Sequence, residues 1–120
     1  MKKYVRGIDF GTLSGRAVVA DVSNGDVISD AVLNYRHGIL EERLPSGKPL
    51  PEHFALADIH DYEEVLFTTV KEAVSKAGIK KEDIIGLGID VTSSTFLPLG
   101  KDLRPLQDDP AFSEEPHSGH

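Results

Sequence analysis

The sequence predicts an α/β fold in which an antiparallel meander of three strands is followed by a helix and a fourth, parallel strand. Two observations lead to this prediction. Apolar, strand-like segments separated by short turns fill the first 35 residues, and a stretch of helical periodicity later runs into another apolar strand. A strand, a helix and a second strand favour a right-handed crossover, which lays the two strands parallel. The 120 residues suffice for one modest domain or for part of a larger one.

The meander is expected to begin with a strand over 4–10, a turn over 11–15 and a second strand over 16–22. The sequence Ser-Asn-Gly-Asp at 23–26 is typical of a tight turn, because asparagine and glycine accept the backbone angles that such turns need. The loosely alternating segment 27–35 then supplies the third strand.

A helix is expected over 62–77, where Asp61 and Glu64 have the spacing of a capping box and Gly78 suits a left-handed C-terminal cap. The apolar positions of this segment recur every three or four residues, at Tyr62, Val65, Leu66, Val70, Ala73, Val74 and Ala77.

The last strand is expected over 84–90, with isoleucine and leucine on one face and two glycines on the other, where a second backbone can approach closely. The strand and a hydroxyl-rich turn together occupy 84–98. The connection 36–60 is unusually long, so we expect an ordered excursion near a substrate site or a subunit contact, with plain surface decoration as the alternative. Residues 100–120 have little periodicity and are expected to form a polar tail.

Composition excludes several classes of function. The net charge of −7 argues against a nucleic-acid partner, because positive surface supplies most of the affinity for a phosphate backbone. No apolar run approaches the length of a membrane span, and Arg6 and Asp9 interrupt the short apolar stretch that could imitate a signal peptide. The absence of cysteine excludes disulfides and thiolate metal sites. We therefore expect a cytoplasmic protein with a small-molecule partner.

The turn after the first strand carries the first candidate site. Gly11, Thr12, Ser14 and Arg16 combine a glycine-bearing turn, two hydroxyls and a guanidinium, which are donors that suit phosphate oxygens. Asp9 would repel a phosphate directly, but its presence is explained if a hydrated Mg²⁺ stands between them. The alternative is an ordinary hairpin in which Asp9 caps the turn and Arg16 is solvated.

The segment Asp-Val-Thr-Ser-Ser-Thr that begins at Asp90 carries the second candidate site. Ligands of open sheets collect beyond the carboxyl ends of strands, so two parallel strands would place Asp9 and Asp90 at one sheet edge, facing one cleft. The alternative is a turn whose hydroxyls satisfy its own backbone. The hydroxyl residues are Thr92, Ser93, Ser94 and Thr95.

Residues 7–25 resemble the first phosphate motif of the FGGY carbohydrate kinases, within the superfamily of actin, hexokinase and the Hsp70 ATPase. The spacing Asp-x-Gly-Thr-x-Ser-x-Arg is similar to that of the FGGY branch. The stretches 35–39, 60–70 and 84–99 are similar to the members of the family that phosphorylate L-ribulose. The resemblance covers 4–99 and continues weakly into the tail.

The resemblance implies a ribonuclease-H-like lobe, ATP and Mg²⁺ as cofactors, and transfer of the γ-phosphate to a pentulose in arabinose catabolism. It implies that Asp9 holds the Mg²⁺ through water and that the residues of the first site contact the β- and γ-phosphates. The hydroxyl turn that follows Asp90 would lie beside the sugar. A homo-oligomeric parent protein is compatible with this family.

The chain departs from the family in length. The resemblance places the catalytic base, the second phosphate motif and the adenosine-binding segment downstream, so we expect an N-terminal fragment that is inactive alone, and Asp90 does not match the base. Two alternatives stay open. One is an FGGY kinase for xylulose, ribitol or D-ribulose, and the other is a complete, non-catalytic module of the actin-like fold that senses nucleotide or contacts a protein.

The histidines give a weaker signal. His117 and His120 have close spacing, but a solvated tail explains them better than a metal site does. His37, in the sequence Tyr-Arg-His-Gly, is a candidate for a role near the substrate. The acidic pairs of the chain are most simply solvated surface.

Overall fold

The computed structural model describes residues 1–92 and 95–120, and the chain divides into two compact units. The first unit contains Met1–Tyr35 and Tyr62–Thr92, and the second contains Arg36–Asp61 and Ser93–His120. Within the described residues, no helix has the length and apolar character needed to cross a bilayer.

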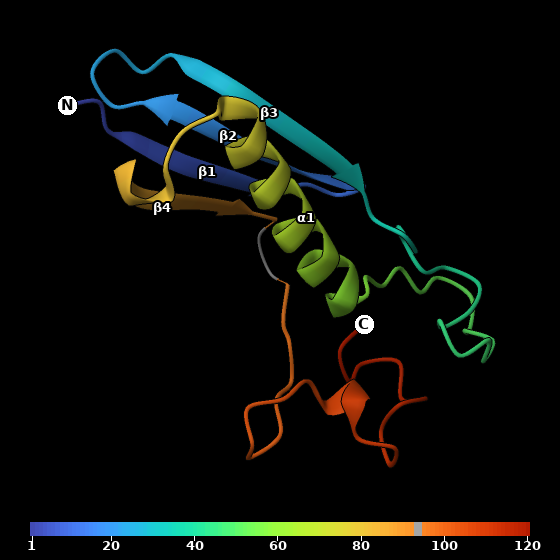
Figure 1. Ribbon diagram of the computed structural model, residues 1–120. Helices are drawn as coiled ribbons and strands as arrows, with labels where there is room; N and C mark the ends of the chain where they lie inside the picture. Colours follow the sequence, from blue (N-terminus) through green and yellow to red (C-terminus); the bar gives the residue numbers. More distant parts are fainter. Residues whose placement is uncertain (93–94) are drawn as a thin grey trace. The chain divides into compact units, whose positions relative to one another are not determined.

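The first unit is a four-stranded sheet with one helix over one face (Figure 1). Its strands are β1 (Tyr4–Phe10), β2 (Ser14–Asp21), β3 (Val27–Asn34) and β4 (Ile84–Val91), in the order β3-β2-β1-β4. The first three strands are antiparallel neighbours, and β4 lies parallel to β1. The predicted meander and the predicted parallel strand are therefore both confirmed.

The core of the first unit is built from small side chains. Ala17 and Val19 of β2, Ala31 of β3 and Ala73 of the helix are at most 2% exposed. Small residues on both surfaces allow the helix to approach the sheet closely, and larger residues such as Val70 close the margin of this cluster. The helix thus covers only one face and leaves the other face of the sheet open.

Two glycines with positive φ lie where the sequence predicts them, one in a turn and one at the end of a helix. Gly25, at φ +78°, lies in the turn between β2 and β3, where its N–H donates to the Asp21 carbonyl at 2.8 Å. Gly78, at φ +64°, follows the last residue of the helix and donates to the Ser75 carbonyl. A side chain at either position would be strained in this left-handed conformation.

The helix α1 spans Ile59–Ala77 and so begins three residues before the expected start at 62. The physical reason is the cap. The Asp58 carboxylate accepts the His60 N–H at 3.0 Å, which makes Asp58 the capping residue in place of Asp61. The expected capping box at Asp61 and Glu64 is therefore wrong.

The second unit contains little regular structure. The connection 36–60 is folded back by two isolated bridges, Leu40 to Leu56 and Arg43 to Pro49, and it buries Leu40 and Leu44. Short 3₁₀ helices occur at Leu106–Asp108 in this unit and at Lys81–Asp83, immediately before β4, in the first.

The expectation of a solvated tail is wrong for its last residues. Ser118 is 3% exposed, and its carbonyl accepts the Gln107 N–H at 3.1 Å. The His117 ring stacks on Phe54 with a centroid separation of 5.5 Å. The backbone hydrogen bonds of this segment close turns, and turns require no regular repeat of apolar residues. The sequence of the segment therefore shows no periodicity.

Candidate functional site

The register of the sheet brings the charged residues of the first candidate site together. Asp9 lies opposite Arg16 across the β1–β2 pair and beside Asp90 across the β1–β4 pair. Because register partners project from the same face of a sheet, all three side chains lie on the face opposite α1. They border a shallow hollow of about 330 Å³, which Gly7 and Gly88 also line.

The three charged side chains of this hollow are exposed and available. Within the described part of the chain, no hydrogen bond or ion pair engages the side chain of Asp9, Arg16 or Asp90. Two carboxylates supply oxygen ligands that a hydrated Mg²⁺ accepts, and a guanidinium supplies paired donors for a phosphate. The arrangement can therefore hold a metal and an anion side by side.

The turn between β1 and β2 is tighter than the sequence predicts, because β2 begins at Ser14. The Gly11 N–H donates to the Ser14 carbonyl at 2.9 Å, and the Gly11 carbonyl accepts the Tyr35 hydroxyl at 2.8 Å. A Cβ at Gly11 would lie 2.9 Å from the Ser14 carbonyl oxygen, so glycine is required there. The Gly11 N–H is therefore engaged within the turn, and the role of Thr12, Ser14 and Arg16 as phosphate donors stays a prediction.

The second candidate site is only partly described. Thr92 directly follows β4 and belongs to the first unit, close in sequence to Asp90. Thr95 is exposed and belongs to the second unit, while Ser93 and Ser94 lie outside the described residues. The grouping of the four hydroxyl residues at one site therefore stays a prediction.

Three side chains of the second unit lie close together, and of these the sequence singles out His37 alone as a site candidate. The His37 Nδ1 lies 2.9 Å from Asp61 Oδ1 and 3.2 Å from Asp58 Oδ2. Both carboxylates are 3% exposed. The sequence shows Asp58 and Asp61 only as residues near a helix start, and nothing in their spacing points to a histidine more than twenty positions away.

The chain resembles known proteins both in sequence and in fold. No family model matches the chain. Curated proteins do match. The chain is 47% identical to the ribulokinases of Anoxybacillus flavithermus and Geobacillus thermodenitrificans over 118 residues, and 44% identical to that of Mycolicibacterium smegmatis over 119 residues. These matches cover 97 to 98% of this chain but only 21% of each relative.

A solved structure supports the fold. The gluconate kinase from Lactobacillus acidophilus matches 87% of this chain with a TM-score of 0.63, at 20% sequence identity and over 18% of its own length. The structural match concerns the fold alone, whereas the sequence matches extend along nearly every residue. The chain is therefore similar in sequence to the ribulokinases along nearly its whole length, and it spans about one fifth of theirs.

Proposed function

We propose that this chain is the N-terminal part of an ATP-dependent sugar kinase that phosphorylates L-ribulose. One observation carries the proposal: the strand register gathers Asp9, Arg16 and Asp90 at one hollow. The names of the relatives support ribulose as the sugar, and the choice of its L form rests on the resemblance of 35–39, 60–70 and 84–99. The strand order and the likeness to a gluconate kinase support a ribonuclease-H-like lobe as the setting.

The residues of the hollow fit MgATP. Bound Mg²⁺ would neutralise charge on the β- and γ-phosphates, which is the main requirement of phosphoryl transfer. Asp9 is exposed and without a partner in the described chain, so it can hold the ion through water. Arg16 would clamp phosphate oxygens, and the hydroxyls of Thr12 and Ser14 would orient them.

The sugar would be bound beyond β4. Thr92 directly follows that strand, and Ser93, Ser94 and Thr95 continue the hydroxyl segment. A base must accept the proton of the attacking hydroxyl, and we assign no such base among these residues. Asp90 lies beside Asp9, where its charge adds to the attraction for the metal. We therefore expect the 120-residue chain to bind nucleotide without turning it over.

A calorimetric titration of the chain with MgATP tests the site. We expect Asp9→Ala and Arg16→Ala each to weaken binding about tenfold, because each removes one charge-assisted contact. Arg104→Ala is the matched control, since it removes an exposed arginine of the second unit and should change nothing. Equal affinities for all four proteins would show that ATP binds elsewhere. No binding by a folded chain would show that the site is not formed within these residues.

The choice of sugar needs the longer protein to which such a chain would belong. Steady-state phosphorylation of L-ribulose, D-ribulose, xylulose and ribitol, each at matched concentration, should give the highest kcat/KM for L-ribulose. A higher value for another sugar would leave the kinase assignment in place and overturn the substrate.

A further inference from the structure

The second unit buries two carboxylates close to one histidine ring. Asp58 and Asp61 are each 3% exposed, and among the described residues His37 is the one basic side chain within ion-pair distance of either. Buried charges in proteins are normally paired or bind metal ions. A protonated His37 would balance one of the two carboxylates, whereas a divalent cation would balance both.

The outer oxygen of each carboxylate is already satisfied by protein donors. Asp58 Oδ1 accepts the His60 N–H and the Gln107 side-chain amide, each at 3.0 Å. Asp61 Oδ2 accepts the His37 backbone N–H at 2.9 Å. These bonds fix both carboxylates and leave one oxygen of each facing the His37 ring, as outer hydrogen bonds commonly do for metal ligands.

The three facing atoms have the separations of metal ligands. The imidazole Nδ1 and the two carboxylate oxygens all lie within 4.8 Å of one another. Bonds of about 2.1 Å at right angles to one ion would place neighbouring ligand atoms about 3 Å apart, and the two measured separations from Nδ1 are 2.9 and 3.2 Å. A His37 ring that donates a hydrogen bond to the carboxylates fits the same distances. An experiment must therefore distinguish a bound metal ion from this hydrogen bond.

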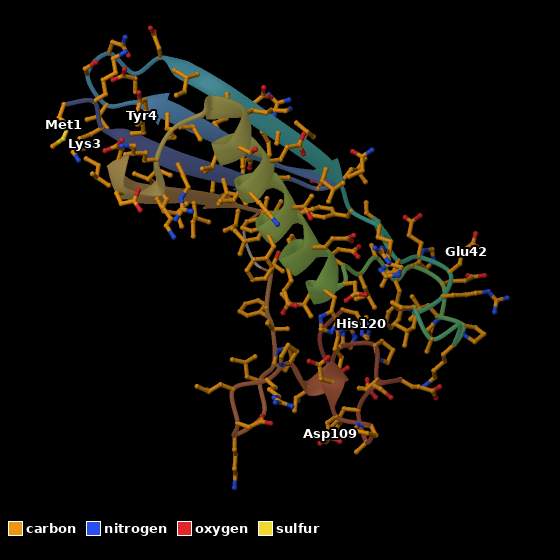
Figure 2. The ribbon with its side chains drawn as sticks, viewed as in Figure 1. Met1, Lys3, Tyr4, Glu42, Asp109 and His120 are labelled. Atoms are coloured by element: carbon orange, nitrogen blue, oxygen red, sulfur yellow. The ribbon has the colours of Figure 1, made fainter. Side chains whose placement is uncertain are left out.

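Two further atoms of this unit lack partners. His120 Nδ1 and Gln107 Oε1 are buried and have no hydrogen-bond partner among the described residues. Figure 2 labels His120, the residue after Gly119. The Gly119 carbonyl accepts the Ile59 N–H at 3.2 Å, in the first turn of α1. Unpaired buried polar atoms indicate a water or an ion beside them.

We propose that His37, Asp58 and Asp61 bind a divalent first-row transition-metal ion of the Mn²⁺ to Zn²⁺ series. Imidazole nitrogen favours such ions over Mg²⁺, and the two carboxylates keep the site accessible to Mn²⁺ as well as to Zn²⁺. The His37 side chain is 34% exposed, which leaves room for water to complete the coordination. The ion would join residue 37 to the first turn of α1, and the ligands share no residue with the Asp9 site.

Calorimetry of the chain with ZnCl₂ and with MnCl₂ tests this site. We expect one saturable site that His37→Asn weakens at least tenfold, because asparagine keeps a donor for Asp61 and removes the ring nitrogen. Asp61→Asn should have the same effect. His53→Asn is the matched control, since His53 is an exposed histidine of the same unit with φ of 69°, a conformation that asparagine tolerates. No saturable site, or equal binding by His37→Asn and the unaltered chain, would overturn the proposal.

A second measurement needs no variant, so it tests metal binding at His37, Asp58 and Asp61 even if the substitutions prevent folding. Substoichiometric Mn²⁺ broadens NMR signals near the ion. Selective broadening of the His37 ring signals and of the Asp58 and Asp61 amides would support the site. Broadening centred on His53 or His117 would overturn it.

Discussion

At the scale of single residues, Asp21 shows how hydrogen bonds within a short loop lower the pKa of a carboxyl group. The Ser23 hydroxyl donates to Asp21 Oδ1 at 2.6 Å and the Ser23 N–H donates to the same oxygen at 2.8 Å. These two hydrogen bonds, with the side-chain bond contributing most, lower the pKa of Asp21 below its ordinary value of 3.8. The bonds favour the charged form because they are accepted by a carboxylate.

This shift has a defined effect on stability. A carboxyl group whose pKa is lowered by folding stabilises the folded chain above its unfolded pKa, and that contribution is lost as the pH falls through the lowered value. We expect Ser23→Ala to raise the pKa of Asp21 toward 3.8 and so to reduce the stabilisation that this carboxylate contributes above its unfolded pKa. A pH titration of the Asp21 carboxyl carbon by NMR measures the shift. An unchanged pKa would show that the bond from the Ser23 hydroxyl does not form in solution.

Single residues also show how far a site can be predicted from sequence. Asp9 and Asp90 were predicted to lie together because both end strands of a crossover unit, and the register places them side by side. Asp61 was assigned to a helix cap, but its carboxylate bonds to His37, 24 positions away. Strand ends follow from local sequence pattern, whereas a bond between a loop residue and a distant helix start depends on the folding of the intervening chain, which no local pattern predicts.

At the scale of elements, the distance between α1 and the sheet depends on one glycine. A Cβ at Gly15 would collide with the Cγ1 of Val65, which is fully buried in α1. The helix can take its position only because β2 has no side chain at this point.

We expect Gly15→Ala to lower the free energy of unfolding by about 1–3 kcal/mol through overpacking. Gly88→Ala is the matched control, because a Cβ at Gly88 meets nothing within 4 Å. Urea denaturation of both variants measures the difference. In the double variant with Val65→Ala the loss at Gly15 should largely disappear, and purely additive effects would contradict the proposed contact.

The elements differ in how well their limits follow from sequence. Strands β1 and β3 begin where the alternation begins, and α1 ends at the expected glycine. The first turn of α1 was missed because its cap, Asp58, belongs to a proline-containing connection that reads as loop. Helix starts of this kind depend on one hydrogen bond, here from the His60 N–H, rather than on a repeated pattern.

At the scale of the whole molecule, the first unit exposes apolar surface at one side of its sheet. β4 is the last strand in the sheet order, and Ile85, Leu87, Ile89 and Val91 are 47–62% exposed. A groove of about 710 Å³ between α1 and β4 adds Phe67, which is 71% exposed. Long apolar edge strands pair readily with another chain.

We therefore expect the isolated 120-residue chain to self-associate through β4. Sedimentation velocity over a range of concentrations should show dimers or larger species. Ile89→Lys, which places a charge on the edge strand, should return the chain to the monomer. Leu103→Lys is the matched control, because Leu103 is 78% exposed but belongs to the second unit. A monomer at all concentrations would contradict the expectation.

The division into two units was not predicted. The connection 36–60 and the tail each lack periodicity, so neither indicates that they form one compact body. Their joint folding relies on polar bonds such as those of Gln107 with Ser118 and Asp58. Bonds between distant turns leave no trace in composition or spacing, which explains why the sheet could be predicted and the second unit could not.

The strand order has a consequence for synthesis on the ribosome. β1 pairs with β2 through a tight turn, but its other neighbour, β4, supplies Gly88 opposite Gly7. At 5–20 residues per second, the roughly 80 residues that separate these partners take about 4–16 s to be made. During that time the nascent meander has an unpaired β1 edge, so the speed of translation and the binding of chaperones decide how often this edge meets the wrong strand.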